Sequence, residues 1–584
     1  MERYVGIDLG TTNSAVSIAY RSVNQEIHTK TLEVRQLDEH GMSFDKLLPS
    51  VLYVDKQGQP FVGKYAKKMA RIYPKQVMGK VKRHMGNEVS WTIAGNQEYR
   101  PEEVSSFVLR ALKNTVENHY LNQKIEGAVI TVPANFDFQQ QDATIKAAQL
   151  AGFNPEKIRL IPEPTAAILD FLNEESHLDE QNRRIQLDQP QNIMVFDLGG
   201  GTCDVTIHRV SRGVNSHMVI QDLSISQYTE LGGIDFDERI MKYLLNQLLT
   251  KKGLQPADLQ RRFDTDFIRK LRENLLDMAE KAKKWIATSV QNRIDFQGAD
   301  WHDSTGVFAS IAYEEIFDLH EDLLTEMVIT KRELDEAIRP LLYQGGYSGI
   351  NIEEPINQAI ESSNIPITKS DINHIFLVGG MTSYPTIKGR IFEIFDGRVE
   401  PLCTINPMES VSRGAAIYAY YQHQIKLQAR DVDDTDQIEK QEWVEDRLIF
   451  PQNIFINVAK GNPVTLVKKG ESIPYSHTFE QGFFVAGSRE DDYVNYMELE
   501  LFTAEDPKAM NVKWLKNARF HFERPVRVGT PLVIQVHVDQ NRSVTVQSWI
   551  RDDQTQMVHV DLGIQEISDE KVKDLRQQHE RLKV

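Results

Sequence analysis

Two short stretches of the sequence contain an aspartate, small residues and threonines between apolar segments, in the same order. Val5–Ile18 reads VGIDLGTTNSAVSI, and Val195–Ile207 reads VFDLGGGTCDVTI. An apolar strand, a small-residue turn and an alternating strand together predict a β-hairpin. Glycines let backbone N–H groups approach a phosphate, threonine hydroxyls add donors, and an aspartate at the strand end can hold Mg²⁺ through water.

The repetition of this motif favours one shared ligand. A single copy is explained equally well as a tight hairpin in a sheet with no ligand. Two copies in register, with a third glycine turn in LVGG at 377–380, instead predict two hairpins that grip a polyphosphate from both sides.

Strands that alternate with helices would position these turns. A helix is predicted from Pro101 to about residue 120, GAVITVPA at 127–134 reads as a buried strand, and a second helix ends near Gly152. The same order of elements restarts at Asn192 and continues to about residue 425. Residues 1–425 are therefore expected to form an α/β domain of two duplicated lobes.

Composition excludes several classes of protein. The chain has 584 residues, 41% hydrophobic and 26% charged, which is typical of a soluble protein with several domains. The net charge of −17 argues against general binding to nucleic acid or anionic membranes. We find no secretory signal and no apolar run of 18 residues, and the two cysteines form no Cys-x-x-Cys pair. A cytoplasmic protein is expected.

The pattern changes after residue 425. Asp431–Asp446 contains eight acidic residues and one lysine without a helical stripe, so residues 426–447 are predicted to be an acidic linker. Period-two alternation over 448–562 predicts a β-sandwich, and residues 563–584 are predicted to form a short helix capped by Ser568.

Several motifs together resemble one known family. GIDLGTTNS, VKRHMG, VITVPANF, PEPTAA, FDLGGGTCDV, LGGIDFD, EKAKK, LVGGMT and INPMESVSRGAA occur in the order and spacing of the 70-kilodalton heat-shock (DnaK-type) chaperones. The resemblance spans residues 1 to about 425 and continues more weakly into INVAKGNPVTLVKKGESIP. It implies an actin-like ATPase domain, followed by a peptide-binding β-sandwich and a much shortened helical lid at 563–584.

The resemblance also implies cofactors and residue roles. The cofactors are ATP or ADP, Mg²⁺ and K⁺. Lys82 matches the lysine that helps to place the attacking water, and Asp204 matches a monovalent-ion ligand. The implied catalytic residues are Lys82, Glu163, Asp197 and Thr202, and the implied metal-site residues are Asp8, Glu163, Asp197 and Asp204. The implied nucleotide-binding residues are Gly10, Thr11, Thr12, Asn13, Gly199, Gly200, Gly201, Thr202, Gly232, Gly233, Glu280, Lys283, Lys284, Gly379, Gly380 and Ser383.

Some positions depart from the family pattern. Ser383 stands where an arginine often stacks on adenine, and Ala287 stands where a serine is usual, so weaker nucleotide binding is expected. Cys203 replaces a common phenylalanine, which favours a buried small residue over a redox sensor. The acidic linker replaces a leucine-rich one, so coupling between the domains is expected to differ. Loose alignment assigns a peptide cleft to Ile456, Ala459, Phe479, Met497 and Leu499, although ordinary sandwich core explains each residue equally well.

Two classes of function follow. The first is an ATP-dependent chaperone that binds and releases unfolded or extended peptide segments, with a J-domain co-chaperone and a nucleotide exchange factor as partners. The second is a nucleotide-gated scaffold or regulator with a weak ATPase and one dedicated partner. A sugar or metabolite kinase is a distant third, because such an enzyme does not need a C-terminal β-sandwich.

Overall fold

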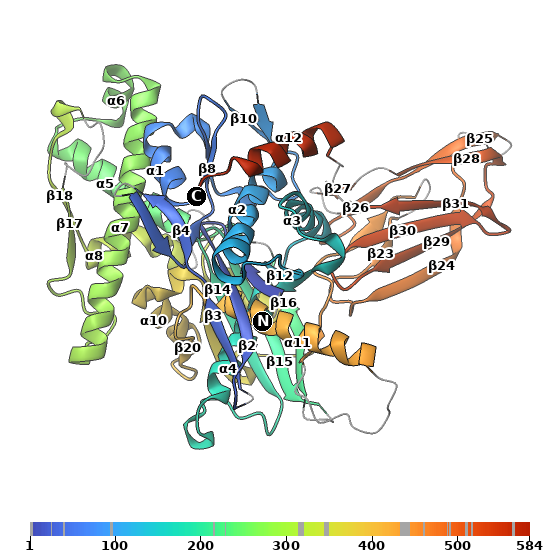
Figure 1. Ribbon diagram of the computed structural model, residues 1–584, viewed down its shortest axis with the longest axis horizontal. Helices are drawn as coiled ribbons and strands as arrows, with labels where there is room; N and C mark the ends of the chain where they lie inside the picture. The colour runs from blue at the N-terminus through green and yellow to red at the C-terminus, as the bar shows by residue number, and fades with distance from the viewer. Residues whose placement is uncertain are drawn as a thin grey trace.

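The computed structural model describes residues 4–584 apart from 25, 39–40, 94–96, 214–216, 228, 313–319, 344–349, 432–443, 459–461, 488, 490–491, 509–511, 516–517 and 563–566. The chain forms a large α/β body, from which a set of β-strands projects to one side (Figure 1). The body has two lobes, each built on its own six-stranded sheet.

The first lobe is built on a sheet with the strand order β13-β12-β1-β2-β3, to which β6 adds at β2. Every residue of β12 is buried, as expected for a strand covered on both faces. The strands are β1 (Tyr4–Asp8), β2 (Asn13–Arg21), β3 (Ile27–Thr31), β6 (Leu48–Pro49), β12 (Gly127–Val132) and β13 (Ile158–Pro162). Other elements of this lobe are β4 (Val34–Asp38), β5 (Gly41–Asp45), β7 (Leu52–Val54), β8 (Pro60–Val62), α1 (Lys64–Ile72), β9 (Val77–Met78), β10 (Trp91–Ile93), β11 (Gln97–Tyr99), α2 (Pro101–Thr115) and α3 (Phe138–Leu150).

The second lobe is built on a sheet with the order β20-β19-β14-β15-β16-β21. Over the described residues, no helix combines the length and apolar composition needed to cross a bilayer, not even the 33-residue α7. The strands are β14 (Gln191–Leu198), β15 (Cys203–Arg212), β16 (Met218–Ile225), β19 (His374–Val378), β20 (Pro401–Cys403) and β21 (Val444–Arg447). Around them lie α5 (Gly233–Lys251), α6 (Pro256–Arg262), α7 (Thr265–Gln297), β17 (Phe308–Ile311), β18 (Met327–Thr330), α8 (Lys331–Leu342), α9 (Glu353–Glu361) and α10 (Pro385–Ile394).

The two sheets share one arrangement at their centres. β1 pairs in parallel with β12 and antiparallel with β2, and β14 pairs in parallel with β19 and antiparallel with β15. Helices α4 (Glu163–Ser176) and α11 (Ser410–Asp431) pack against each other, and their apolar core includes residues of both sheets. The repeated hairpins of the sequence therefore occupy equivalent places in the two lobes.

The segment predicted as linker takes on structure at both ends. α11 extends to Asp431, and β21 pairs in parallel with β16, as the outermost strand of the second sheet. The acidic side chains of β21 have basic partners: Glu445 lies 3.0 Å from His217, and Asp446 lies 3.6 Å from Arg159. These basic partners are distant in sequence, so they cannot be recognised from the local composition. For this reason the acidic composition predicts a linker. Residues 432–443 lie outside the described residues.

The strands that follow β21 form a separate core. They make sheets with the orders β24-β29-β30-β31 and β23-β22-β26-β27 and the pair β25-β28, with buried residues of both four-stranded sheets in one cluster. The strands are β22 (Ile454–Ile456), β23 (Val464–Val467), β24 (Tyr475–Phe484), β25 (Tyr493–Leu499), β26 (Leu501–Thr503), β27 (Lys513–Trp514), β28 (Ala518–Arg527), β29 (Pro531–Val538), β30 (Val544–Ile550) and β31 (Asp553–Asp561). We call this part the sandwich.

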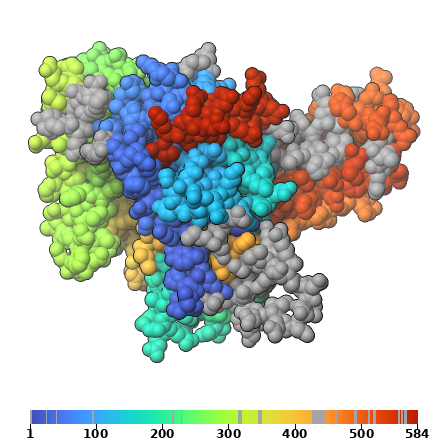
Figure 2. Space-filling view, in the orientation of Figure 1, coloured from blue at the N-terminus to red at the C-terminus, as the bar shows by residue number. Residues whose placement is uncertain are grey.

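The last helix, α12 (Asp569–Glu580), lies on the first lobe and not on the sandwich (Figures 1 and 2). The Ser568 hydroxyl caps α12 by accepting a hydrogen bond from the Lys571 amide, as the sequence predicts. Leu575 is fully buried in the core of the first lobe. The chain then runs beside β8, where the Val62 amide donates to the Lys583 carbonyl at 2.9 Å. The segment predicted as a shortened lid is therefore part of the packing of the first lobe.

Candidate functional site

The two glycine turns meet at the centre of the body. The turn between β1 and β2 carries Thr11 and Thr12, and the turn between β14 and β15 carries Gly200 and Gly201. A Cβ atom on Gly200 would lie 1.8 Å from the Thr12 hydroxyl oxygen, and one on Gly201 would lie 2.6 Å from a Thr11 methyl carbon. Only glycine allows this approach, so the backbone amides and the threonine hydroxyls of both turns line one space.

A second pair of glycines supports the turn of the second lobe. The Gly233 amide donates to the Gly199 carbonyl at 2.9 Å, at the start of α5. A Cβ atom on Gly232 would lie 2.4 Å from the Gly201 nitrogen, so the two backbone segments are in direct contact. Gly379 has φ +84°, and its Cβ position would lie 2.6 Å from an Asp197 carboxylate oxygen. These glycines bring three loops to the ends of β14 and β19.

Four carboxylates lie around the meeting point: Glu163, Asp197 and Asp204 are buried, and Asp8 is half-buried. Asp8 ends β1, Asp197 lies near the end of β14, Asp204 pairs with it across the hairpin, and Glu163 begins α4. Burial, and then the nearby Glu163 carboxylate, raise the pKa of Asp8 and of Asp204 to about 7. The same two causes raise the pKa of Asp197 well above its ordinary value. The local arrangement therefore crowds four carboxyl groups together, and their mutual repulsion and burial disfavour the charged forms.

Lys82 is the cation among these carboxylates. It lies in the 3₁₀ turn η2 (Val81–His84) and is buried, with its ammonium group paired to Glu163. Burial acts to lower the pKa of Lys82, but the carboxylates of Glu163 and Asp8 outweigh it and the pKa is raised. The ammonium group therefore stays charged in the site.

The carboxylate set fits a hard cation such as Mg²⁺. One ammonium faces four carboxylates, and the buried Oδ2 atom of Asp204 has no hydrogen-bond partner among the described residues. Among the described residues, no three of these carboxylates bring their oxygens within 4.8 Å of one another. Mg²⁺ keeps several of its waters when it binds to proteins, so these groups would hold it largely through water.

Helix α7 supplies the wall of the site opposite the turns. Burial acts to raise the pKa of Glu280, but the ammonium groups of Lys67 and Lys284 outweigh it and lower the pKa to about 2. Lys283 pairs with Asp237 at 2.7 Å. Lys67 belongs to α1 of the first lobe, so its 2.8 Å contact with Glu280 joins the two lobes.

These groups surround a cavity of about 970 Å³. Most of the residues that the sequence assigns to nucleotide, metal or catalysis line it, and Ser383 and Ala287 line it as well. Gly201, Gly232 and Asp204 do not line it; they contact residues that do. The lining residues predicted from sequence are Asp8, Gly10, Thr11, Thr12, Asn13, Lys82, Glu163, Asp197, Gly199, Gly200, Thr202, Gly233, Glu280, Lys283, Lys284, Gly379, Gly380 and Ser383.

Sequence reasoning did not find the basic face of α1. Lys67 and Arg71 are four residues apart and contact Glu280 and Asp277, which are three residues apart on α7. This matched spacing was a usable signal, because residues three and four apart lie on one face of a helix. Cys203 is fully buried in the core of the second lobe, and burial raises the pKa of its thiol, which favours a packing role.

The residues assigned to a peptide cleft lie in the sandwich core. Ile456, Met497 and Leu499 are buried there, and Phe479 is half-buried against the same cluster. Ala459 lies outside the described residues. Their role in peptide binding stays a prediction.

The sequence of this chain is similar to those of known proteins. A family model described as "Hsp70 protein" matches residues 4–584. The chain belongs to the Hsp70 family. It is 32% identical over 419 residues to "Chaperone protein DnaK" of Nitrosopumilus maritimus (strain SCM1). The aligned region covers 72% of this chain and 56% of that protein. It is also 32% identical over 418 residues to "Chaperone protein DnaK" of Thermoplasma volcanium, which covers 71% of this chain and 58% of that protein.

Hsp70 membership agrees with the general architecture. The family combines an actin-like ATPase domain with a β-sandwich domain, and this chain has a two-lobed α/β body followed by a sandwich. The matches to the two DnaK proteins span less than two thirds of their lengths.

Proposed function

We propose that this chain is an ATP-dependent molecular chaperone that hydrolyses ATP in the cleft between its lobes and binds and releases unfolded or extended peptide segments. One observation carries the proposal: both glycine turns, with a buried lysine and buried carboxylates between them, line a single cavity. Backbone amides and hydroxyls suit phosphate oxygens, and the excess of carboxylates suits Mg²⁺. Membership of the Hsp70 family supports the same assignment.

The residues of the cleft have distinct proposed roles. The backbone amides and threonine hydroxyls of the two turns, at Thr11, Thr12 and Gly200, would bind phosphate oxygens. Asp8 and Asp197 would hold Mg²⁺ through water, with K⁺ near Asp204. Bound Mg²⁺ supplies positive charge beside the β- and γ-phosphates. The Lys82 ammonium stabilises negative charge on the γ-phosphoryl, and the carboxylate of Glu163 holds that ammonium in place.

The base end of the cleft is expected to bind more weakly. Glu280 and Lys283 face the proposed ribose position, and Lys284 supplies one cation beside the base. Ser383 offers no side chain that can stack on adenine. The loss of one stacked cation weakens binding by about 1 kcal/mol.

The decisive experiment is ATP turnover by the purified chain. Lys82→Ala is expected to lower turnover at least about a hundredfold, because a cation at the transferring phosphoryl is lost. Lys56→Ala, an exposed lysine in the turn before β8, is the matched control and is expected to keep full activity. Retained ADP binding by Lys82→Ala would show that this variant is folded. Equal turnover in the wild type and Lys82→Ala would reject the ATPase assignment.

A second candidate is a nucleotide-gated scaffold with a weak ATPase and one dedicated partner. The burial of Ile456, Met497 and Leu499 favours it, because a general peptide site needs an accessible groove. Suppression of aggregation separates the two candidates: a chaperone protects several unrelated denatured proteins, and a dedicated scaffold protects none. A peptide array probed with and without ATP tests nucleotide control. Stimulation of turnover by a J-domain and by an exchange factor tests the proposed partners.

A further inference from the structure

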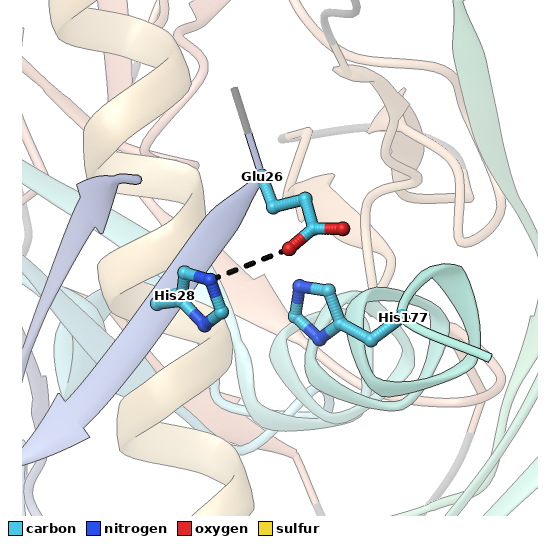
Figure 3. Close-up of side chains that lie close together, drawn as sticks. All are labelled: Glu26, His28 and His177. Atoms are coloured by element: carbon cyan, nitrogen blue, oxygen red, sulfur yellow. Dashed lines mark ion pairs between the residues drawn. The ribbon is translucent and has the colours of Figure 1, made fainter. Parts of the chain in front are cut away.

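Three metal-ligating side chains meet on the surface of the body, outside the nucleotide cleft (Figure 3). Glu26 directly precedes β3, and His28 is the second residue of that strand, so the two are two residues apart. His177 directly follows the last residue of α4 and is the C-cap of that helix. None of the three lines the cavity between the lobes. Two distant segments therefore contribute to one cluster.

The ligand atoms of this cluster lie close to the arrangement that a tetrahedral metal needs. The carboxylate oxygen and one nitrogen of each imidazole lie within 4.8 Å of one another. The His28 Nε2 atom is already 3.6 Å from a Glu26 oxygen. Bonds of about 2.1 Å in tetrahedral geometry require ligand atoms about 3.4 Å apart. The side chains of His28 and Glu26 are 40% and 50% exposed, so they are free to rotate toward a bound ion.

The two imidazoles lie against each other, and His28 also contacts Glu26 and the Tyr20 ring. The rings of His28 and His177 are nearly parallel, with centroids 4.9 Å apart and planes at 10° (Figure 3). No hydrogen bond to the His177 ring is formed within the described part of the chain. Within that same part, this is also the one group of three such side chains whose ligand atoms converge so closely. His320 and Asp322, a histidine–carboxylate pair at 3.6 Å, lack the second imidazole.

We propose that Glu26, His28 and His177 form a site for a divalent late transition metal, and that the ion bound there is Zn²⁺. Two imidazoles and one carboxylate suit Zn²⁺ and leave a fourth position for water, whereas Mg²⁺ and Ca²⁺ prefer all-oxygen sites. His177 caps the carboxyl end of α4, where the helix dipole favours a cation.

The bound metal joins two parts of the body. β3 is the edge strand of the first sheet, and α4 begins at Glu163 in the nucleotide cleft and ends at the metal site. The metal therefore fixes the edge of the first lobe to the far end of the helix that carries a proposed catalytic carboxylate. The metal site itself lies outside the cleft and needs no nucleotide to bind there.

The test is Zn²⁺ binding to the untagged, nucleotide-free chain in excess Mg²⁺, which occupies the carboxylates of the cleft. Calorimetric titration of the wild type is expected to show one Zn²⁺ site, with visible absorption of tetrahedral type when Co²⁺ replaces Zn²⁺. His28→Ala and His177→Ala should each weaken binding at least about tenfold, because one of three protein ligands is lost. Glu26→Gln should weaken it less, and the matched control His320→Ala should leave it unchanged.

A second readout distinguishes loss of the metal site from misfolding of a variant. Zn²⁺ is expected to raise the melting temperature of the wild type and of His320→Ala but not of His177→Ala. His177→Gln is the alternative if the alanine variant does not fold, which loss of its wild-type circular dichroism spectrum would reveal. Absence of Zn²⁺ binding by the wild type, or unchanged binding in both histidine variants, would overturn the proposal.

Discussion

His579 shows how one buried side chain can make a contact sensitive to pH. It lies in α12 against the first lobe, with its Nε2 atom 2.9 Å from the Ser106 hydroxyl and its ring centroid 4.4 Å from that of Phe107. Burial, and then the nearby Arg110 cation, lower the pKa of His579 to about 4. In the unfolded chain a histidine has a pKa near 6.5. The folded protein therefore holds this residue neutral.

The sign of the pH dependence follows from that shift. Between about pH 6.5 and pH 4, the unfolded chain binds a proton that the folded chain does not, so stability falls as the pH falls. His579 is expected to lower the free energy of unfolding by about 3 kcal/mol as the pH falls through this range. Chemical denaturation of the wild type and of His579→Gln at each pH measures the difference, because glutamine is neutral throughout. Parallel pH profiles for the two proteins would contradict this prediction.

At the residue scale, local motifs predicted which side chains come together in the cleft. Gly10 and Gly199 belong to turns with the same motif, and duplicated sheets place both on one cavity. The nucleotide roles of these residues stay predictions. The cluster of Glu26, His28 and His177 left no such signal, because the meeting of β3 with α4 depends on tertiary packing.

At the element scale, α12 is held by its apolar face. Leu575 is fully buried in the core of the first lobe, and the Tyr99 hydroxyl donates to the Gln578 side chain at 2.6 Å. Local signals predicted the helix and its Ser568 cap. They did not predict where the helix packs, because its partners lie more than 400 residues earlier in the chain.

Leu575→Ala tests this packing. Removal of a buried leucine side chain is expected to lower the free energy of unfolding of the first lobe by about 2–5 kcal/mol. The matched control is Arg576→Ala, which changes an exposed neighbour on the same helix and should cost less than about 0.5 kcal/mol. Urea denaturation followed by hydrogen exchange in α2 measures both. Equal stability of the two variants would show that α12 does not contribute to this core.

At the scale of the whole molecule, Arg542 connects the sandwich to both lobes. It follows β29 in a turn, with φ +60°, and is 2% exposed. Its guanidinium donates to the Ala134 carbonyl of the first lobe at 2.7 Å and lies 3.8 Å from Asp222 of the second lobe. Burial lowers the pKa of Arg542 to about 10. A buried cation in a left-handed conformation is costly, so its contacts with the body must offset that cost.

Arg542→Gly separates the two effects. Glycine relieves the backbone strain, so the sandwich itself should keep its stability or gain up to about 1 kcal/mol. The contact with the body should weaken, because a charged hydrogen bond is worth about 1.5–3 kcal/mol. The reporter is hydrogen exchange of the Ile449 amide, which donates to Asp222 at 3.4 Å and should exchange about tenfold faster. Arg551→Gly, at an exposed arginine of the sandwich, is the control; unchanged exchange in Arg542→Gly would contradict the prediction.

The path of the chain makes the sandwich an insertion within the α/β body. β21 leaves the second lobe, and α12 brings the chain back into the first lobe. Both ends of the sandwich are therefore attached to the folded α/β body even while the sandwich itself is unfolded. Tethering restricts the unfolded ensemble and favours refolding in place. Circular permutants cut within the sandwich would lose this restraint while keeping every residue.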